Sequence, residues 1–232
     1  MADIIQSFID YCNNNDIEKA KEIYDPSIIN INSITYDTNT SKIQGPYNIF
    51  ECMCIKNHLE IVKWFIELGI DSVHYDNGFV SACQYNHIEI AEYLNDNKKN
   101  IKLGFQTAFL IVCYQGHFEL LKWLFMNTDY KIDLHMNNET PFLYAIAEGH
   151  FDIAKWLYYI SISDEKIIDI HADNDYAFIY ACNNGRLDIC KWLYLISNNT
   201  IDKHMQDNMP LKAAKLSGNE ELIQWLENID KV

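Results

Sequence analysis

The chain has 232 residues, 33 of them acidic and 18 basic, which gives a formal net charge of −15 at pH 7. Such a surface repels phosphate backbones, so it argues against nucleic acid and favours a protein partner with a basic surface. The longest apolar run, residues 108–114, is too short to span a membrane, and the N-terminus shows no basic segment followed by an apolar one, so neither membrane insertion nor secretion is expected.

The first predicted helix pair, residues 4–24, keeps only part of the apolar pattern that follows. Lys19 and Glu22 stand where later units carry apolar residues. A terminal repeat has a neighbour on one side only, so its outer face must be polar. We therefore predict an N-terminal capping repeat here. The next segment, residues 25–46, is rich in Asn, Ser, Thr and Asp and is predicted to be an irregular loop or extended hairpin.

Residues 138–157 are the clearest element and predict two short helices in succession. Thr140 can cap the first helix through its hydroxyl, and Pro141 suits a first helical position that needs no N–H. Gly149 ends this helix, because a residue without Cβ adopts the left-handed conformation at little cost. Asp152 then lies in the first turn of a second helix, where the helix dipole favours a carboxylate.

This unit recurs along the chain with a period near 33 residues. We call the residue equivalent to Gly149 the anchor of each unit. Phe or Leu stands seven residues before every anchor, an acid stands three after it, and all five tryptophans stand seven after one. The anchors are Asn15, Asn57, Asn86, Gly116, Gly149, Gly185 and Gly218. A period of this length is typical of stacked helix pairs.

The recurrence predicts an all-α solenoid of about seven helix pairs joined by hairpin loops. We expect a single domain over residues 1–232, with core repeats in 47–197 and a C-terminal capping repeat in 198–232. The tryptophans are predicted to lie in the core between repeats. Nothing in the pattern requires self-association, so a monomer is expected.

The chain resembles the ankyrin-repeat family. The resemblance rests on residues 140–145 (Thr-Pro-Phe-Leu-Tyr-Ala) and 149–153 (Gly-His-Phe-Asp-Ile), and the other units carry weaker matches to the same pattern. One departure is that the histidine that often follows Thr-Pro-Leu in the family is missing in every unit. The composition, rich in Asn and Tyr, with residues 181–185 (Ala-Cys-Asn-Asn-Gly) and 191–193 (Lys-Trp-Leu), is similar to that of repeats encoded by large DNA viruses. These resemblances imply a non-enzymatic scaffold for protein–protein interaction, and the second implies a host-cell cytoplasmic location and a host partner.

Ankyrin repeats typically bind proteins through the concave side of their first helices and through their hairpin tips. Tyr85 and Tyr114 stand out, because packing does not require tyrosine there and tyrosine is common in interface hot spots. The alternative is ordinary solvated surface. By register, the helix positions are Gln84, Tyr85, Tyr114, Gln115, Ala147, Glu148, Asn183 and Asn184, and the tip positions are Met136, Asn137, Glu139, Ala172, Asp173 and Asp175.

The cysteines and histidines also follow the repeat. Five of the seven cysteines stand three residues before an anchor, where the central unit has Ile146, so we interpret them as packing residues in a reducing, cytoplasmic compartment. Cys52 and Cys190 leave a cysteine-dependent enzyme as the alternative. The histidines recur in register, and the resemblance implies that they tie loops to helices by hydrogen bonds. His-x-Glu occurs without the Pro-Cys-x-x-Cys of zinc deaminases, so no metal, cofactor or catalytic residue is predicted.

Overall fold

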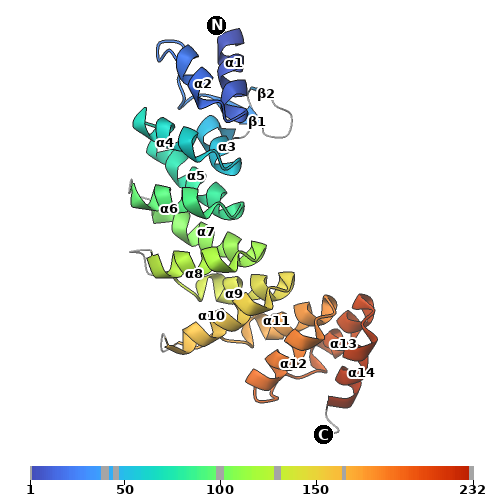
Figure 1. The fold of residues 1–232 in the computed structure, drawn as a ribbon. Coiled ribbons are helices and arrows are strands. Elements are labelled where there is room, and N and C mark those ends of the chain that lie inside the picture. The colour runs from blue at the N-terminus through green and yellow to red at the C-terminus, as the bar shows by residue number, and fades with distance from the viewer. Residues whose placement is uncertain are drawn as a thin grey trace. The chain divides into compact units, whose positions relative to one another are not determined.

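The computed structural model describes residues 2–37, 42–43, 47–97, 102–127, 132–163 and 166–229, and these residues are mostly helical (Figure 1). Three short strands lie between the second and third helices. The helices are α1 (Ala2–Asn13), α2 (Ile17–Ile23), α3 (Ile49–Ile55), α4 (Leu59–Glu67), α5 (Ser72–Gln84), α6 (Ile88–Asp96), α7 (Lys102–Gln115), α8 (Phe118–Asn127), α9 (Met136–Glu148), α10 (Phe151–Ser163), α11 (Ala172–Asn183), α12 (Leu187–Ile196), α13 (Met205–Ser217) and α14 (Glu220–Asn228).

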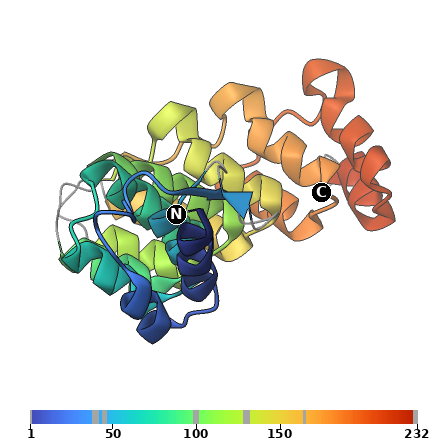
Figure 2. The same cartoon turned by 90° about the horizontal axis from the view of Figure 1, so that it is seen from above.

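The chain forms two compact units. Unit 1 comprises residues 1–112 and 122–131, and unit 2 comprises residues 113–121 and 132–232. Within unit 1, α1 packs on α2, α3 on α4 and α5 on α6, while α3 lies between α1 and α5. Within unit 2, α9, α11 and α13 pack side by side, each with its own partner α10, α12 or α14 (Figures 1 and 2). The predicted all-α arrangement of helix pairs is therefore confirmed, whereas the division into capping and core repeats of one domain stays a prediction.

A small antiparallel sheet has two strands in the segment predicted to be a loop or extended hairpin, residues 25–46, and a third strand directly after it. Strand β1 (Thr35–Asp37) pairs with β2 (Lys42–Ile43) on one side and with β3 (Tyr47–Asn48) on the other. Asn48 is buried and joins the sheet to α3: its Nδ2 donates to the Ile31 carbonyl at 3.0 Å, and its Oδ1 accepts from the Phe50 N–H at 2.8 Å. Residues 38–41 and 44–46 of the predicted hairpin lie outside the described residues.

Aromatic side chains fill the interior of both units. The phenylalanines seven residues before an anchor are at most 1% exposed, and they are Phe8, Phe50, Phe79, Phe109, Phe142 and Phe178. At about 150–250 Å² of area per ring and about 25 cal/mol per Å², burial of each contributes roughly 4–6 kcal/mol before entropic costs. These rings, together with the buried cysteines, form the core on which the helix pairs stack.

The tryptophans differ from the sequence prediction. Trp64 is 8% exposed, but the four others are only half-buried. Trp192 contacts Phe142 at a centroid distance of 6.1 Å, and Trp225 contacts Phe178 at 6.3 Å. Most of the indoles therefore cover the edge of the aromatic core, with one side toward solvent, because the second helix turns this position away from the interior.

Every anchor residue adopts the left-handed backbone conformation. The φ angles are between 57° and 62° at the three asparagines and between 64° and 81° at the four glycines. Asn and Gly are the residues that enter this region most easily, and one such residue reverses the chain direction after a helix. The predicted role of the anchor is confirmed in all seven units.

Histidines after the anchors connect consecutive helix pairs. The Nε2 atom of His58 lies 3.2 Å from the Asn13 carbonyl oxygen, that of His87 lies 2.8 Å from Ile55 O, and that of His150 lies 2.9 Å from Tyr114 O. Each carbonyl stands two residues before the preceding anchor. Burial lowers the pKa of His58, which favours a neutral ring with one N–H to donate. The expected tie between loop and helix is confirmed for these three residues.

Near its start, each of α9, α11 and α13 contains three residues in the left-handed conformation, after which the regular helix begins; we call these three residues the turn before the helix. These are Asn137 to Glu139, Asp173 to Asp175, and Gln206 to Asn208. A histidine precedes each turn and bonds to its last residue; His135 Nδ1, for example, lies 2.9 Å from the Glu139 carboxylate. The predicted cap at Thr140 is corrected, because its hydroxyl donates to the Asn137 carbonyl at 2.7 Å and so closes the left-handed turn.

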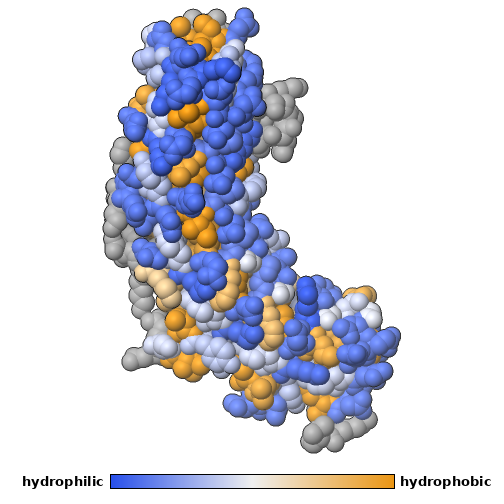
Figure 3. Space-filling model, in the orientation of Figure 1, coloured by the Kyte–Doolittle hydropathy of each residue, from blue (hydrophilic) through white to orange (hydrophobic). Residues whose placement is uncertain are grey.

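Apolar side chains also remain at the surface, in small groups. On the face shown in Figure 3, hydrophobic patches are interrupted by hydrophilic surface. Isolated exposed apolar residues of this kind are normal in soluble proteins and do not by themselves mark a binding site.

Phe142→Ala tests the contribution of the aromatic core. Phe142 is 0% exposed, so we expect the substitution to reduce the free energy of unfolding by about 3–5 kcal/mol. Tyr144→Ala, on the same helix but 40% exposed, is the control and is expected to cost about 1 kcal/mol or less. Urea unfolding followed by circular dichroism measures both; equal losses would contradict the assignment of the core.

Gly116→Ala tests the contact between turns. Both Gly116 and Gly218 have positive φ, so alanine costs about 1–2 kcal/mol of backbone strain at either position. A Cβ on Gly116 would also lie 2.4 Å from the His150 ring, whereas one on Gly218 meets no atom within 4 Å. We expect Gly116→Ala to lose about 1–3 kcal/mol more than Gly218→Ala. Equal unfolding free energies of the two variants would refute the close packing of His150.

Candidate functional site

Unit 2 carries a groove of about 460 Å³ on its first helices, which we call the tyrosine groove. Its lining comes from the end of α7, from α9 and from the left-handed turn and following helix of α11. The lining residues are Tyr114, Thr140, Leu143, Tyr144, Ala147, Glu148, Asp173, Tyr176 and Tyr180. Four of these nine residues are tyrosines, so aromatic rings determine the chemistry of this surface.

Helical periodicity explains why these side chains meet. On α9, Thr140, Tyr144 and Ala147 stand nine, five and two residues before the anchor Gly149. Residues four and seven apart lie on one face of a helix, and here this face is opposite the one that buries Phe142. On α11, Tyr176 and Tyr180 stand nine and five residues before the anchor Gly185, as Thr140 and Tyr144 do before Gly149. Neighbouring helices therefore present matching rows of side chains to the groove.

The four tyrosines form two pairs of perpendicular rings. Tyr114 and Tyr144 have centroids 5.5 Å apart at 75°, and Tyr176 and Tyr180 have centroids 5.1 Å apart at 69°. Each side chain is between 38% and 44% exposed. The edge-to-face contacts hold the rings in place and leave part of each phenol open to a ligand.

The lining of the groove is acidic. Glu148 and Asp173 are exposed, and none of the nine lining residues is Lys, Arg or His. The Oδ1 atom of Asp173 accepts a hydrogen bond of 2.6 Å from Asn138 Nδ2, which ties the turn before α11 to the turn before α9. The tyrosine groove therefore combines aromatic faces with two carboxylates and has no positive charge of its own.

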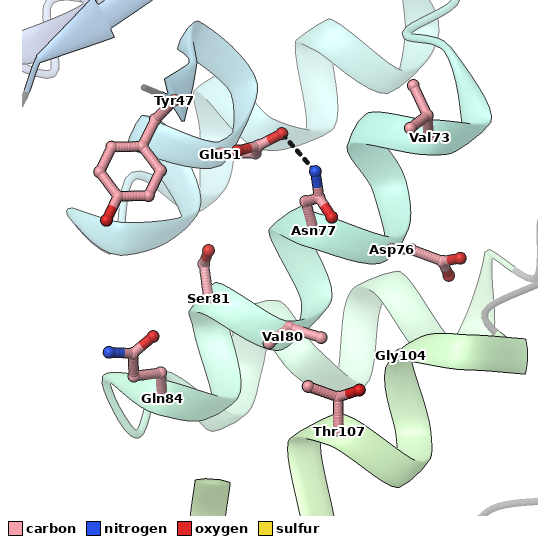
Figure 4. Close-up of a pocket in the computed structure, with 10 residues that line it drawn as sticks. All are labelled: Tyr47, Glu51, Val73, Asp76, Asn77, Val80, Ser81, Gln84, Gly104 and Thr107. Atoms are coloured by element: carbon pink, nitrogen blue, oxygen red, sulfur yellow. Dashed lines mark hydrogen bonds between the residues drawn. The ribbon is translucent and has the colours of Figure 1, made fainter. Parts of the chain in front are cut away.

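Unit 1 has a groove at the equivalent register, and its lining mixes polar and apolar side chains with a single aromatic residue, Tyr47 (Figure 4). Asn77, Ser81 and Gln84 stand nine, five and two residues before the anchor Asn86, and the groove encloses about 510 Å³. Glu51 faces Asn77 across it, and the two are joined by a hydrogen bond of 2.9 Å. Glu51 is buried and lies 3.2 Å from His74 Nδ1, so this carboxylate has internal partners. The remaining lining residues are Val73, Asp76, Val80, Gly104 and Thr107.

The structure distributes the sequence-predicted site residues over three environments. Tyr114, Ala147, Glu148 and Asp173 line the tyrosine groove, and Gln84 lines the groove of unit 1. The exposed residues outside both grooves are Tyr85, Gln115, Asn137, Asn183 and Asn184. The buried or half-buried residues are Met136, Glu139, Ala172 and Asp175.

Burial removes part of the predicted tip surface. Glu139 is 5% exposed; its carboxylate lies 2.9 Å from His135 Nδ1 and accepts from the Asp169 N–H at 3.2 Å. Met136 is 8% exposed and Ala172 is 5% exposed. Their side chains support the left-handed turns, so we leave these three residues out of the surface proposed below.

Sequence reasoning missed most of the groove. Tyr144, Tyr176 and Tyr180 were not among the predicted site residues, and neither were Thr140 and Leu143. Helical periodicity could have found two of them, because Tyr144 and Thr140 stand three and seven residues before the predicted site residue Ala147, on the same face of the helix. Only the packing of α9 beside α11 shows that rows on different repeats line one groove.

Asn184 and His150 fix the edges of this surface. The Nδ2 atom of Asn184 donates to the Ala147 carbonyl at 2.7 Å, and His150 bonds to the Tyr114 carbonyl. Both acceptors are backbone atoms of groove residues. The spacing of the helices that carry the tyrosines is therefore set by hydrogen bonds between repeats.

The cysteine thiols are buried, and burial holds some of them in the protonated form. All seven cysteines are buried; burial raises the pKa of Cys12 to about 12 and that of Cys190 well above its usual range, which keeps these thiols protonated. In the described parts of the chain, no group of three or more His, Cys, Asp or Glu side chains is placed to hold a metal ion. Of the helices that the structure describes, none has the length and apolar character needed to cross a membrane.

Comparison with known proteins identifies the repeat. A family model described as ankyrin repeats (3 copies) matches residues 79–166, and no curated protein sequence matches the chain. Among solved structures, the human ASB11 ankyrin repeat domain is similar, with a TM-score of 0.66 and 17% identity over 94% of this chain and 96% of that one. At this identity the likeness concerns the fold alone. The predicted all-α, ankyrin-repeat fold class is thereby confirmed.

Thiol labelling tests the cysteine-dependent alternative. Because Cys52 and Cys190 are 0% exposed, we expect a maleimide to label neither in the folded protein and to label all seven cysteines in urea. Mass spectrometry of the labelled peptides measures the extent at each site. Rapid labelling of Cys52 or Cys190 in the native protein, with the others unreacted, would instead favour a nucleophilic cysteine.

Proposed function

We propose that this protein is a non-enzymatic scaffold that binds a protein partner in the tyrosine groove of unit 2. Ankyrin-repeat folds commonly serve protein–protein interaction, and their first helices and hairpin tips are the usual docking surface. The groove lies on the first helices, and Asp173 places a tip residue beside it. We therefore narrow the proposed docking surface from the set of first helices and tips to this groove.

The observation that carries this proposal is the placement of four tyrosines with no packing role. Each is more than a third exposed, and Tyr144 and Tyr180 stand where other repeats have Asp10, Ser81 or Ala213. A helix pair therefore folds without an aromatic residue at this position. Tyrosine is enriched in interface hot spots because it buries a large area at little entropic cost and keeps a polar end.

The surroundings of the groove support a protein partner of a particular kind. The chain carries a net charge of −15, which attracts basic surfaces over a distance and speeds encounter. We propose a partner with a basic surface, bound by a monomer in the cytoplasm. The compositional resemblance to repeats of large DNA viruses extends this proposal to a protein of the host cell.

Affinity capture with matched variants tests the site. We expect Tyr144→Ala/Tyr180→Ala to lose the partner that the wild type captures, because it removes one ring from each pair. Tyr159→Ala is the control: Tyr159 is 57% exposed on α10 and lies outside the groove. Partners are quantified by mass spectrometry, and each variant is first shown to keep its melting temperature.

The comparison is made only for partner proteins that both the wild type and Tyr159→Ala capture above background. Loss of such a protein in the groove variant supports docking in the groove. Equal capture by the wild type, the groove variant and Tyr159→Ala would show that the partner binds elsewhere on the chain, and the assignment of the groove would then be wrong.

A further inference from the structure

We propose that the tyrosine groove recognises a positively charged side chain of its partner, arginine before lysine, held against the phenol faces between Glu148 and Asp173. This inference rests on the proposed function, because it names the chemistry of the segment that the groove would take. It goes beyond a general attraction to basic proteins, because it assigns the charge to one site and makes aromatic faces part of the recognition.

The negative charge of the groove favours a cationic occupant. Two carboxylates and no basic group line it, so an occupant with a neutral or acidic side chain would desolvate both without compensating their negative charge; among the described residues, Asp173 has only the neutral hydrogen bond from Asn138. A cation in the groove compensates both.

In the groove of unit 1, Glu51 is buried against His74 and Asn77 and has its partners. Asp76, by contrast, has a buried Oδ1 without a hydrogen bond from the described residues, and that groove offers a single tyrosine, Tyr47, and no ring pair.

The exposed faces of the tyrosine rings favour a cationic occupant as well. A cation within about 6 Å of an aromatic centroid is attracted by the electron-rich face of the ring. The chain itself makes this contact repeatedly: Lys155 Nζ lies 4.3 Å from the Phe151 centroid, and Lys63 Nζ lies 5.6 Å from that of Tyr93. In the groove, rings are clustered and partly open while the lining offers no cation. A partner can supply the missing charge.

The geometry favours arginine over lysine. A guanidinium is flat and stacks on a ring while its N–H groups bond to a carboxylate, and both kinds of group are present here. An ammonium offers one compact charge that is more strongly hydrated. The volume of about 460 Å³ lies within the range of about 300–1,000 Å³ that is usual for small ligand pockets, so a long side chain and adjoining backbone fit.

A peptide pair isolates the charge. The probe is a short fluorescent peptide in which arginine alternates with glycine and serine, and its control carries citrulline, which has nearly the same shape without the charge. We expect fluorescence anisotropy to give at least about tenfold weaker binding for the citrulline peptide at low salt. Replacement of arginine by lysine is expected to weaken binding by a smaller factor.

Two variant series isolate the site. Tyr144→Phe/Tyr180→Phe keeps the ring faces and is expected to bind the arginine peptide within about twofold of the wild type, whereas Tyr144→Leu/Tyr180→Leu is expected to lose about tenfold. Glu148→Gln/Asp173→Asn is expected to lose about tenfold as well. Its control, Glu220→Gln/Glu221→Gln, changes the net charge equally on exposed residues of α14 and is expected to stay within about twofold.

The outcomes separate this inference from the proposed function. Equal binding of the arginine and citrulline peptides, equal binding by the Leu and Phe variants, or equal losses in the two charge variants would overturn recognition of a cation in the groove. Partner capture that still depends on Tyr144 and Tyr180 would then leave the docking function standing. If capture is independent of these residues while the peptide results hold, the docking function falls and the cation site remains.

Discussion

The left-handed anchor residue is the constraint on which each helix pair depends. It turns the chain at the end of the first helix, so that the second helix packs back against it, and only Gly and Asn occupy it in this chain. The next pair then closes over this turn. His150 lies on Gly116, Arg186 on Gly149, and Asn219 bonds to the Gly185 carbonyl. At Gly116 and Gly149, backbone reversal and contact between repeats are therefore one feature of the structure, because the side chain that covers the turn occupies the space that a Cβ would fill.

On α9 and α11, the two faces of the first helix differ in burial. The residue seven before the anchor, Phe142 on α9, is buried between helix pairs, whereas those nine, five and two before it face away from the core. Core packing does not determine which residue types stand at these three outer positions. The same three positions are Asn77, Ser81 and Gln84 in unit 1, yet they supply tyrosines in unit 2. Because packing leaves these positions free, their side chains can differ from one repeat to the next.

The two grooves show how one register yields different chemistry. In unit 1 the nearby carboxylate of Glu51 is buried and bonded within the protein. In unit 2 the corresponding surface has open ring faces and exposed carboxylates. The tips contribute as well: the left-handed turn before α11 holds Asp173 at the edge of the groove, with Asn138 of the preceding turn bonded to it. Hydrogen bonds between turns thus place the acidic edge.

The sequence by itself determined the helix pairs, the anchors and the buried phenylalanines and cysteines, because each depends on residues at fixed separations within one repeat. The histidine ties between repeats followed from the family resemblance. The sequence also placed Tyr114, Glu148 and Asp173 among the site residues. Only the tertiary structure decided that Glu139 and Met136 are buried, that most tryptophans stay half exposed, and that Tyr144, Tyr176 and Tyr180 share one groove. These features arise where residues of different repeats meet, and the distance between such residues is set by the packing of neighbouring helices, which no spacing along the chain records.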